Sequence, residues 1–501
     1  MLYIPIAVRF VLDTETLASS GVHIVTGSSD YWITVSPTSS LGQQAKQVLI
    51  NTPYINGSSD IVNWIDVTLN YNVFPYLSTF LESFARTNGF EVTPTPRVSF
   101  VSGSCPLLCQ KVPLHRYKQY KPDPGVENGT PCQVTLCPFN LTNSLLFSTY
   151  VAHGSLTTRL GDSLGYLSDL KYLENMVGGV VVQTPDSIDI GVVAQHIRKV
   201  NGDGDLVVVL LWGKVLETVG IADVFSRSGP KRHLASDDSA TIVAWPKFPV
   251  FPVRTVLTTN GHSSWGSCVL LKNDLLVTNT HVLTPYLEDP LGTVLVIDLP
   301  DGPLTILNQK HALVTPSSLV DISTISLAES DILRFTGLGY SPALYQQQRQ
   351  QRSLPPIVGQ NVVSVGYGLY LLPQWQSPGV SQGTLDLVFR SRYNANTPYK
   401  MPSLIITSAS CWNGSSGGGL FRDNELVGII CSNAEVRVDG RPLEDDGNAP
   451  VEKLTRFVFV VPIELVEYLI SGGSIEDDGP LVKTWKLDTF HKDRILGETK
   501  L

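Results

Sequence analysis

The stretch that decides the fold is WGSCVLLKNDLLVTNTHVL, which runs from Trp265 to Leu283. It reads as an apolar strand, a tight turn at Lys272-Asn273-Asp274, a second strand and then His281. Short runs rich in Val, Ile and Leu between turn residues are typical of strands in sandwiches and barrels. Such runs recur along the whole chain, for example as VHIVTG, TVLVIDL, VVSVGYGLY and RFVFVVPI. The pattern predicts an all-β fold.

Composition narrows the class of protein. Of the 501 residues only 16% are charged, against about 25% in an average soluble protein, while 43% are hydrophobic. The 36 Lys and Arg against 45 Asp and Glu leave a net charge of −9, so we expect no nucleic-acid partner. The longest apolar runs, such as LVVVLLW, are far shorter than the roughly 20 residues of a membrane span. The N-terminus lacks the pattern of a secretory signal, and the seven cysteines do not resemble a disulfide framework, so we expect a soluble intracellular protein with mostly reduced thiols.

Two polar stretches divide the chain. SRSGPKRHLASDDSA, from Ser226 to Ala240, separates two β-rich halves, and YQQQRQQRSLPP, from Tyr345 to Pro356, reads as a surface loop. The domains expected from these breaks are a first half at 1–225, a linker at 226–250, a second half at 251–475 and a C-terminal tail at 476–501.

The two halves share a sequence echo. The first contains NMVGGVVVQTPDSIDIGVVAQHI from Asn175, and the second contains GSSGGGLFRDNELVGIICSNA from Gly414. Each has a Gly-Gly turn, a strand, a polar turn and a second strand. Aligning the Gly-Gly pairs puts Val177 opposite Ser416. Either the first half is a copy that has lost this hydroxyl, or two β-hairpins resemble each other by chance.

Three residues of the second half form a candidate catalytic set. His281 follows a strand, Asp321 opens LVDISTISLAE, and Ser416 lies in the Gly-rich turn of CWNGSSGGGLF. A serine hydroxyl is a weak nucleophile, so it needs a base, and the base needs an orienting group. His281 would take the proton from Ser416, and Asp321 would hold the histidine tautomer. Asp331 is the competing acid.

The glycines around Ser416 serve a second need. A sharp backbone turn can aim N–H groups at a developing oxyanion, which a bulky side chain would obstruct. The N–H groups of Gly414 and Ser416 are the expected donors. Each feature alone is weak evidence for a catalytic site, because a flexible turn or a surface acid can have the same sequence.

Together, TNTHV, VDISTISL and GSSGGGLF resemble the three catalytic motifs of trypsin-like serine peptidases. Within that group the chain is most similar to the peroxisomal leader-peptide-processing proteases, relatives of the bacterial Deg/HtrA enzymes, in WGSCVLL, VGQNVVSVGYG, LVGIICSN and FVFVVPI. The resemblance covers about residues 255–470. It implies a double β-barrel with the triad in its cleft, preceded by a degenerate trypsin-like N-terminal half, and no metal or cofactor.

The resemblance also places a substrate pocket. It implies that Ser410 lies at the base of the pocket, with Cys431, Ser432 and Asn433 along one wall. No acid stands at the base, so a preference for Arg or Lys is not supported. A small uncharged side chain is expected, and the resemblance implies cleavage after Cys. The other interpretation is that Cys411 and Cys431 only pack near the cleft.

The last three residues, Thr499, Lys500 and Leu501, are similar to the Ser-Lys-Leu peroxisomal address. The resemblance therefore implies the peroxisomal matrix as location, an import receptor as partner, and imported matrix proteins as peptide substrates. A homo-oligomer remains open.

Several alternatives stay open at this stage. Cys105, Cys109, Cys132 and Cys137 are free thiols, a zinc site or marks of autoprocessing. The protein is a leader-processing endopeptidase, a Deg-like quality-control protease of broad specificity, or a non-catalytic trypsin-like module that binds peptides or acts as a chaperone.

Overall fold

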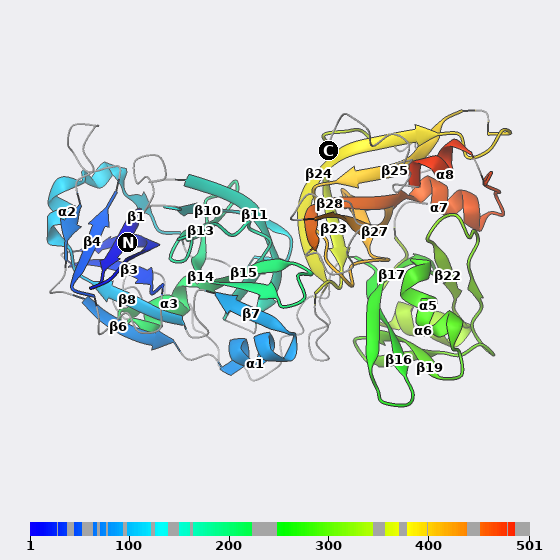
Figure 1. Cartoon of the computed structure of the whole chain (residues 1–501), viewed down its shortest axis with the longest axis horizontal. Helices are drawn as coiled ribbons and strands as arrows, with labels where there is room; N and C mark the ends of the chain where they lie inside the picture. The colour runs from blue at the N-terminus through cyan, green and yellow to red at the C-terminus, as the bar shows by residue number, and fades with distance from the viewer. Residues whose placement is uncertain are drawn as a thin grey trace. The chain divides into compact units, whose positions relative to one another are not determined.

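The computed structural model divides the chain into two compact units, Met1–Val243 and Ala244–Leu501 (Figure 1). It describes residues 1–27, 29–37, 45–52, 64–67, 71–76, 79–93, 98–121, 126–138, 150–160, 164–222, 248–343, 356–369, 378–397, 399–437, 451–477 and 479–485. The polar stretch 226–240, nearly all of the loop 345–356 and the terminal tripeptide 499–501 lie outside these residues.

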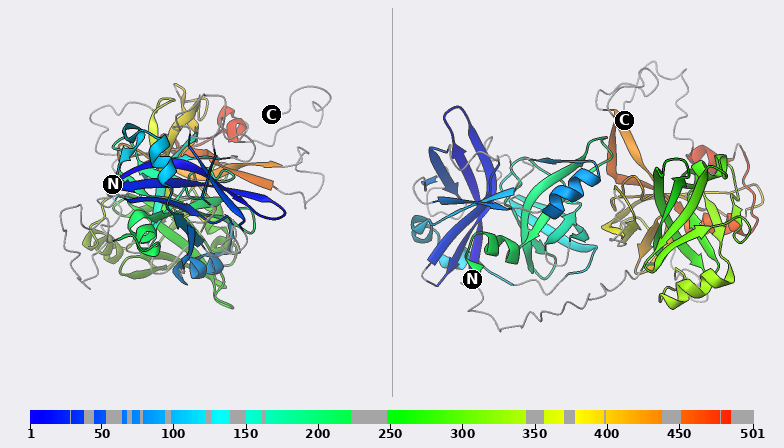
Figure 2. Two further views of the ribbon diagram at one scale, coloured as in Figure 1. Left: turned by 90° about the vertical axis from the view of Figure 1, so that its left-hand side faces the viewer. Right: turned by 90° about the horizontal axis from the view of Figure 1, so that it is seen from below.

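The first unit begins with an antiparallel sheet of long strands. Its main path runs in the order β5-β4-β1-β2-β3-β8-β6, and β9 pairs with β1. The blue strands β1 to β3 twist past one another in the right-hand view of Figure 2. The strands are β1 (Leu2–Val11), β2 (Thr16–Thr26), β3 (Ser29–Val35), β4 (Gln47–Asn51), β5 (Ile65–Asp66), β6 (Tyr71–Tyr76), β8 (Val98–Gly103) and β9 (Lys118–Gln119).

The rest of the first unit is a second sheet, in the order β13-β10-β11-β12-β15-β14-β7. Because β13 also pairs with β14, six of these strands close a ring. The strands are β7 (Phe90–Thr93), β10 (Thr130–Leu136), β11 (Tyr150–Leu160), β12 (Gly165–Ser168), β13 (Val180–Gln183), β14 (Asp189–Lys199) and β15 (Asp205–Leu211). Short helices flank the sheets at α1 (Thr79–Thr87), α2 (Pro106–Lys111), η2 (Leu114–Arg116) and α3 (Trp212–Thr218).

The second unit repeats this plan. Its first sheet has the order β20-β19-β16-β17-β18-β22-β21 and carries two helices. The elements are β16 (Val250–Leu257), β17 (Ser263–Lys272), β18 (Leu275–Thr278), α5 (Thr280–Glu288), β19 (Thr293–Leu299), β20 (Gly302–Ile306), β21 (Leu313–Val314), β22 (Ser323–Ser326) and α6 (Glu329–Gly337).

Its second sheet is a closed six-stranded barrel, β23-β24-β25-β28-β27-β26. The elements are β23 (Asn361–Gly366), β24 (Gly379–Ser391), β25 (Met401–Thr407), β26 (Gly419–Arg422), β27 (Glu425–Arg437), β28 (Val451–Pro462), α7 (Ile463–Ile470) and α8 (Pro480–Trp485). Helix α7 has the sequence IELVEYLI and buries Ile463, Leu465, Val466 and Leu469. The tail expected from residue 476 contains α8, which buries Leu481 and Val482 in the core of this unit.

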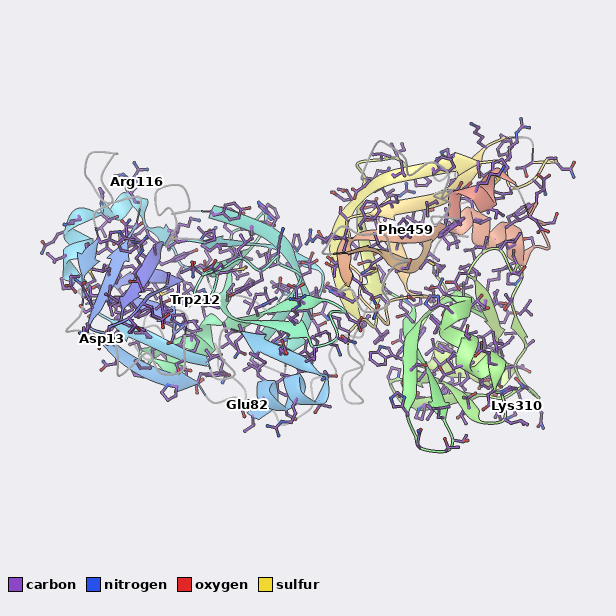
Figure 3. The ribbon with its side chains drawn as sticks, in the orientation of Figure 1. Asp13, Glu82, Arg116, Trp212, Lys310 and Phe459 are labelled. Carbon is purple, nitrogen blue, oxygen red and sulfur yellow. The ribbon has the colours of Figure 1, made fainter. Side chains whose placement is uncertain are left out.

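Side chains fill the space between the strands. In Figure 3 Trp212 lies inside the first unit and Lys310 lies at the outer edge of the second. Trp212 and Phe421 are each 1% exposed, which illustrates how completely the large apolar side chains are covered. Strands paired on both sides leave few positions for charge, and this explains the low charged fraction of the sequence. The all-β class is confirmed, and each unit contains one sheet whose strands close into a ring.

Each unit has the same pattern of backbone hydrogen bonds around its Gly-Gly turn. In the second unit Gly417 N–H donates to Ile430 O at 2.9 Å, and Ile430 N–H returns to Gly418 O at 2.8 Å. In the first unit Gly178 N–H donates to Val193 O at 2.7 Å, and Val193 N–H returns to Gly179 O at 2.9 Å. The Gly-Gly pairs therefore occupy equivalent places in equivalent turns.

Candidate active site

Ser416 lies in the loop that joins β25 to β26, and glycine gives this loop its shape. Gly414 has a φ of +93°, a conformation that residues with a Cβ rarely adopt. A Cβ there would stand 2.4 Å from Trp265 Nε1 and 2.5 Å from Tyr367 O. Both neighbours are fixed, because Trp265 Nε1–H donates to Tyr367 O at 2.9 Å. No larger residue fits at Gly414.

Ser267, on strand β17 of the first sheet of this unit, holds this loop in place by hydrogen bonds. Ser267 N–H donates to Ser416 O at 2.7 Å, and Ser267 Oγ–H donates to Gly414 O at 2.9 Å. Ser267 Oγ also accepts the N–H of Tyr367 at 2.8 Å, while Thr278 Oγ1–H donates to Ser267 O at 2.7 Å. Strands β17 and β18 of the first sheet thus set the position of the loop that joins β25 to β26 of the closed barrel.

The fastened loop leaves the N–H groups of Gly414 and Ser416 unused. The N–H groups of Ser415, Gly417 and Gly418 are occupied, since they donate to Trp412 O, Ile430 O and Ser415 O. Within the described residues, the N–H groups of Asn413, Gly414 and Ser416 have no hydrogen-bond acceptor. The last two are the donors that the sequence predicted for the oxyanion hole. Unused backbone donors on a rigid loop can stabilise developing negative charge without reorganisation.

His281 and Asp321 come together beside the first sheet of this unit, where β18 ends and β22 begins. Strand β18 ends at Thr278, and His281 lies in the first turn of α5, where the sequence led us to expect a strand exit. Asp321 lies two residues before β22, which pairs with β18. Its Oδ2 accepts His281 Nδ1–H at 2.5 Å, and its Oδ1 accepts His281 N–H at 2.9 Å. This two-point contact fixes both the position and the tautomer of the imidazole, which leaves Nε2 free to act as a base.

Asp321 is ionised at neutral pH in this setting. Its partial burial alone would raise the pKa of the carboxyl, but hydrogen bonds and charge from His281 outweigh burial and lower it below the ordinary value. Cys431 Sγ–H adds a donor to Oδ2 at 3.4 Å. Burial and the nearby Asp321 charge raise the pKa of the Cys431 thiol well above its usual value, so the thiol stays protonated and can donate.

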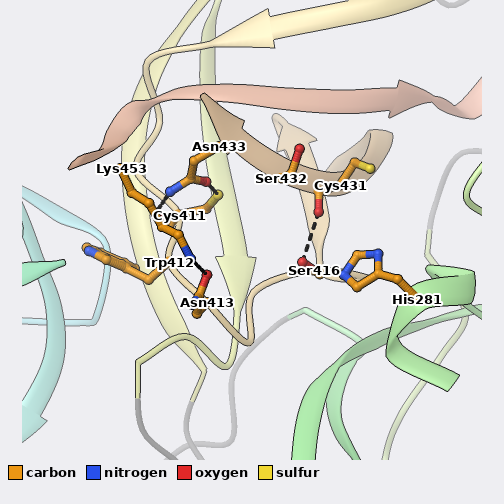
Figure 4. Close-up of a pocket in the computed structure, with 9 residues that line it drawn as sticks. All are labelled: His281, Cys411, Trp412, Asn413, Ser416, Cys431, Ser432, Asn433 and Lys453. Carbon is orange, nitrogen blue, oxygen red and sulfur yellow. Dashed lines mark hydrogen bonds between the residues drawn. The ribbon is translucent and has the colours of Figure 1, made fainter. Parts of the chain in front are cut away.

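The Ser416 side chain faces His281 in Figure 4, but its hydroxyl is engaged elsewhere. Ser416 Oγ–H donates to the carbonyl of Cys431 at 2.8 Å. The hydroxyl must leave that carbonyl to pass its proton to His281 Nε2. Nucleophile–base hydrogen bonds are often loose in the absence of substrate and tighten when it binds.

The competing acid is placed away from His281. Asp331 Oδ2 accepts His311 Nε2–H at 2.7 Å, and His311 is almost fully buried. Asp331 is therefore the partner of a different histidine, and Asp321 is the acid that bonds His281.

A small pocket opens beside Ser416 and encloses about 140 Å³. Its lining residues, drawn in Figure 4, are His281, Cys411, Trp412, Asn413, Ser416, Cys431, Ser432, Asn433 and Lys453. The predicted wall residues Cys431, Ser432 and Asn433 are all present. Ser410, predicted at the base, is not a lining residue and is only 2% exposed.

Sequence reasoning missed several residues of this site. Trp412 and Asn413 stand next to the Gly-rich turn, so their position was a usable signal. Lys453 comes from β28, and Ser267 is an ordinary strand serine in the sequence. The roles of Lys453 and Ser267 become visible only from the contacts that they make in the folded structure.

The first unit keeps the hydrogen bonds that hold its Gly-Gly loop in place, but it lacks the three candidate catalytic residues. Ser20 N–H donates to Val177 O at 2.9 Å, and Ser20 Oγ–H donates to Asn175 O at 2.8 Å, as Ser267 does in the second unit. In β-sheet register Thr34 pairs with Val101 as Thr278 pairs with Ser323. By this register the counterparts of His281, Asp321 and Ser416 are Pro37, Ser99 and Val177. None of the three can perform the corresponding role.

The four N-terminal cysteines are free thiols that do not gather into one metal-sized group within the described residues. One mixed group, His23, Asp30 and Cys109, is compact enough for an ion. His23 Nε2 lies 3.3 Å from Asp30 Oδ2, and His23 Nδ1 lies 3.0 Å from Tyr117 Oη. These hydrogen bonds account for the cluster without a metal.

Comparison with known proteins adds to this picture. Residues 266–429 match the family described as "Trypsin-like peptidase domain". No curated protein matches the chain by sequence. The second unit therefore has a trypsin-like peptidase fold, and this fold together with the site geometry supports a serine protease.

Solved structures give weaker similarities. The active form of the Rv3671c protease from M. tuberculosis has 16% identity and a TM-score of 0.30, over 46% of this chain and 82% of that chain. Deg5 has 16% identity and a TM-score of 0.30, over 46% and 92%. The MamO protease domain from Magnetospirillum magneticum has 15% identity and a TM-score of 0.28, over 44% and 96%. Scores this low carry no argument about function.

The structure also bears on membrane insertion. Over the described part of the chain, no helix is long and apolar enough to cross a bilayer.

We expect Ser267→Ala to loosen the nucleophile loop. The change leaves Gly414 O and Tyr367 N–H without their partner, and a buried unsatisfied group costs about 1–3 kcal/mol. Ser264→Ala is the matched control, because Ser264 lies on the same strand and, within the described residues, its hydroxyl bonds the hydroxyl of Thr255 and no backbone group of the nucleophile loop. Thermal unfolding should show a clear loss for Ser267→Ala and a small one for Ser264→Ala; equal losses would contradict the fastening role.

Proposed function

We propose that the chain is a serine endopeptidase in which Ser416 is the nucleophile, His281 the general base and Asp321 the orienting acid. The observation that carries this proposal is the two-point contact of Asp321 with His281, beside a serine whose loop leaves the N–H groups of Gly414 and Ser416 unused. A hydroxyl, a base, an oriented tautomer and an oxyanion site are the parts that acyl transfer requires.

Acylation would proceed as follows. Ser416 Oγ attacks the scissile carbonyl carbon while His281 Nε2 takes the hydroxyl proton, and Asp321 stabilises the resulting imidazolium. The carbonyl oxygen becomes an oxyanion that accepts the N–H groups of Gly414 and Ser416. His281 then gives its proton to the leaving nitrogen as the C–N bond breaks. The C-terminal product leaves, and the N-terminal part remains as an ester on Ser416.

Deacylation would use the same groups. His281 Nε2 takes a proton from a water molecule, whose oxygen attacks the ester carbonyl. The second oxyanion collapses, the C–O bond to Ser416 breaks, and His281 returns the proton to Oγ. No metal or cofactor takes part in this sequence.

Binding of the substrate backbone would also release the Ser416 hydroxyl from the Cys431 carbonyl. The Cys431 carbonyl accepts the Ser416 hydroxyl in the free protein, and it lies on β27, a strand that lines the pocket. An extended substrate donating its own N–H to that carbonyl competes with Ser416 for it. The displaced hydroxyl then turns to His281 Nε2, so that the base engages when substrate is bound.

The finer proposal concerns substrates and location. The resemblance of the sequence to peroxisomal leader-processing proteases supports imported matrix proteins as substrates, cut at targeting leaders or internal linkers. The similarity of Thr499, Lys500 and Leu501 to a peroxisomal address supports an import receptor as partner. The coarser candidate is a Deg-like protease with broad specificity.

The first test compares two aspartates. We expect Asp321→Asn to lower kcat/KM for peptide cleavage by about 10⁴-fold, because the amide favours the wrong histidine tautomer while keeping the shape. Asp331→Asn changes the same atoms beside His311 and should leave kcat/KM within about threefold. Equal losses in both variants, or an active Asp321→Asn, would contradict the proposed triad.

The second test maps products. Full-length protein is incubated separately with a peptide that carries a peroxisomal targeting leader and with denatured casein, and the cut sites are read by mass spectrometry. Processing predicts one dominant cut in the leader peptide and little degradation of casein, and Ser416→Ala should abolish both. Many cuts in casein at equal rates would favour the broad-specificity protease, and no cut in either would favour a non-catalytic binding module.

A further inference from the structure

Asn279 is a fully buried asparagine that lies two residues before His281, at the N-cap of α5. Asparagine is favoured at this position, because its side-chain oxygen can accept an N–H of the first helical turn. The Asn279 side chain makes no such bond, and within the described residues its Oδ1 has no hydrogen-bond partner. Its Nδ2–H donates instead to the main-chain carbonyl of Asp321 at 2.8 Å. The amide therefore holds the segment that carries the acid and not its own helix.

The cap of α5 is supplied by Asp321. Its Oδ1 accepts the N–H of His281, the second residue of the helix, at 2.9 Å. That N–H is one of those that a capping side chain ordinarily accepts. Asn279 and Asp321 thus exchange hydrogen bonds, since the carboxylate caps the helix that carries the base and the amide holds the main chain of the acid. Asp321 is fixed at its backbone as well as at its carboxylate.

The first unit shows which bond this carbonyl has where the strand continues. In the register of the sheets, Ser99 is the counterpart of Asp321. Strands β3 and β8 stay paired through Val35 and Phe100, and the N–H of Ser36 then donates to Ser99 O at 2.8 Å. A main-chain donor of the neighbouring strand therefore holds the carbonyl at this position.

The second unit ends the same strand earlier, where the helix begins. The last pair of β18 and β22 is Thr278 with Ser323, and α5 starts at Thr280. The turn from strand to helix presents the base, but it ends the main-chain pairing before the acid is reached. The Asn279 amide supplies to Asp321 O the N–H that the counterpart of Asp321 receives from the main chain in the first unit.

We propose that Asn279 is a positioning residue of the triad, which holds the main chain of Asp321 so that its carboxylate stays on His281 where the strand has given way to a helix. This inference rests on the proposed peptidase function, because it assigns a further residue to the same site. The counterpart of Asn279 in the first unit is Val35, whose side chain cannot donate a hydrogen bond. The unit that lacks the base keeps its strand pairing and needs no amide at this position.

The start of α5 does not depend on Asn279 alone. Thr280 Oγ1 lies 2.9 Å from Ser323 Oγ, which also lies 2.8 Å from Thr315 Oγ1. These hydroxyl contacts join the helix to β22 without involving Asp321. Loss of the Asn279 amide should therefore leave the junction folded and release the main chain of Asp321.

The test is Asn279→Val in full-length protein, which introduces the residue found at this position in the first unit. Valine suits the extended backbone of Asn279, and the substitution also removes a buried oxygen that has no partner among the described residues. We expect kcat for peptide cleavage to fall about tenfold or more with KM within about threefold of wild type, because alignment of acid and base acts on the chemical step. The thermal unfolding temperature should change little.

Asn308→Val is the matched control. Asn308 Oδ1 accepts the hydroxyl of Tyr286, a residue of the same helix α5, at 2.8 Å. The variant removes one amide bonded to α5 without altering the contact of Asp321 with His281, so it should keep kcat within about twofold. Equal losses of kcat in both variants would contradict a role specific to Asn279. If Asn279→Val folds poorly, Asn279→Gly, which also lacks the amide and is tolerated at an N-cap, should show the same loss of kcat.

The proton between His281 Nδ1 and Asp321 Oδ2 gives a readout that does not need peptidase activity. A proton held closely between an imidazole and a carboxylate resonates far downfield in proton NMR, and Asp321→Asn, which removes the carboxylate, identifies it. We expect this resonance in wild type and in Asn308→Val, and a weakened or upfield-shifted one in Asn279→Val. An unchanged resonance in Asn279→Val, or none in the wild type, would overturn the positioning role. A resonance lost in Asn279→Val from a wild type that cuts no peptide would retain that role and reject the peptidase function.

Discussion

The contact on which the site depends is the fastening of the nucleophile loop by Ser267. One serine on β17 holds Ser416 O through its backbone and Gly414 O through its hydroxyl, at 2.7 and 2.9 Å. The expected oxyanion donors are the N–H groups of the same two residues. Because each peptide unit is planar, these donors are oriented by the carbonyls of Asn413 and Ser415, which accept Leu369 N–H at 2.7 Å and Gly418 N–H at 2.9 Å. Ser267 thus anchors the loop to the sheet that also carries His281 and, before β22, Asp321, while these other bonds orient the donors.

The same fastening in the first unit separates folding from chemistry. Ser20 holds Asn175 O and Val177 O there, and a Cβ on Gly178 would stand 1.9 Å from Ser20 O, just as one on Gly417 would stand 1.9 Å from Ser267 O. The packing that needs the Gly-Gly turn is therefore intact in both units. Only the second unit places a hydroxyl in that turn and a histidine and acid opposite it. A fold of this kind persists after its reactive groups are lost, because its stability comes from strand pairing and burial.

Much of this was predictable from residues that are special for local reasons. The short Val-rich strands predicted the β class, and the occurrence of the Gly-rich turn at Ser416 together with TNTHV and VDISTISL predicted the nucleophile loop, although each motif alone is ambiguous. The sequence alone could not decide whether Asp321 or Asp331 bonds His281, since both are acids near the same strand. Only the pairing of β22 with β18 places Asp321 against His281. The resemblance implied that Ser410 lies at the base of the pocket, but Ser410 is 2% exposed and does not line it. Ser267 and Lys453 act through tertiary contacts alone, and no periodicity or motif in the sequence marks them.

The central claim is that the second unit holds an assembled nucleophile and the first holds none. Intact-mass analysis of the full-length protein after reaction with a fluorophosphonate tests it most directly, followed by peptide mapping of the modified residue. The account predicts one adduct per chain, on Ser416, and no adduct when the protein is denatured before the reaction or when Ser416 is replaced in Ser416→Ala. No adduct on the folded protein, or an adduct on a hydroxyl of the first unit, would contradict it.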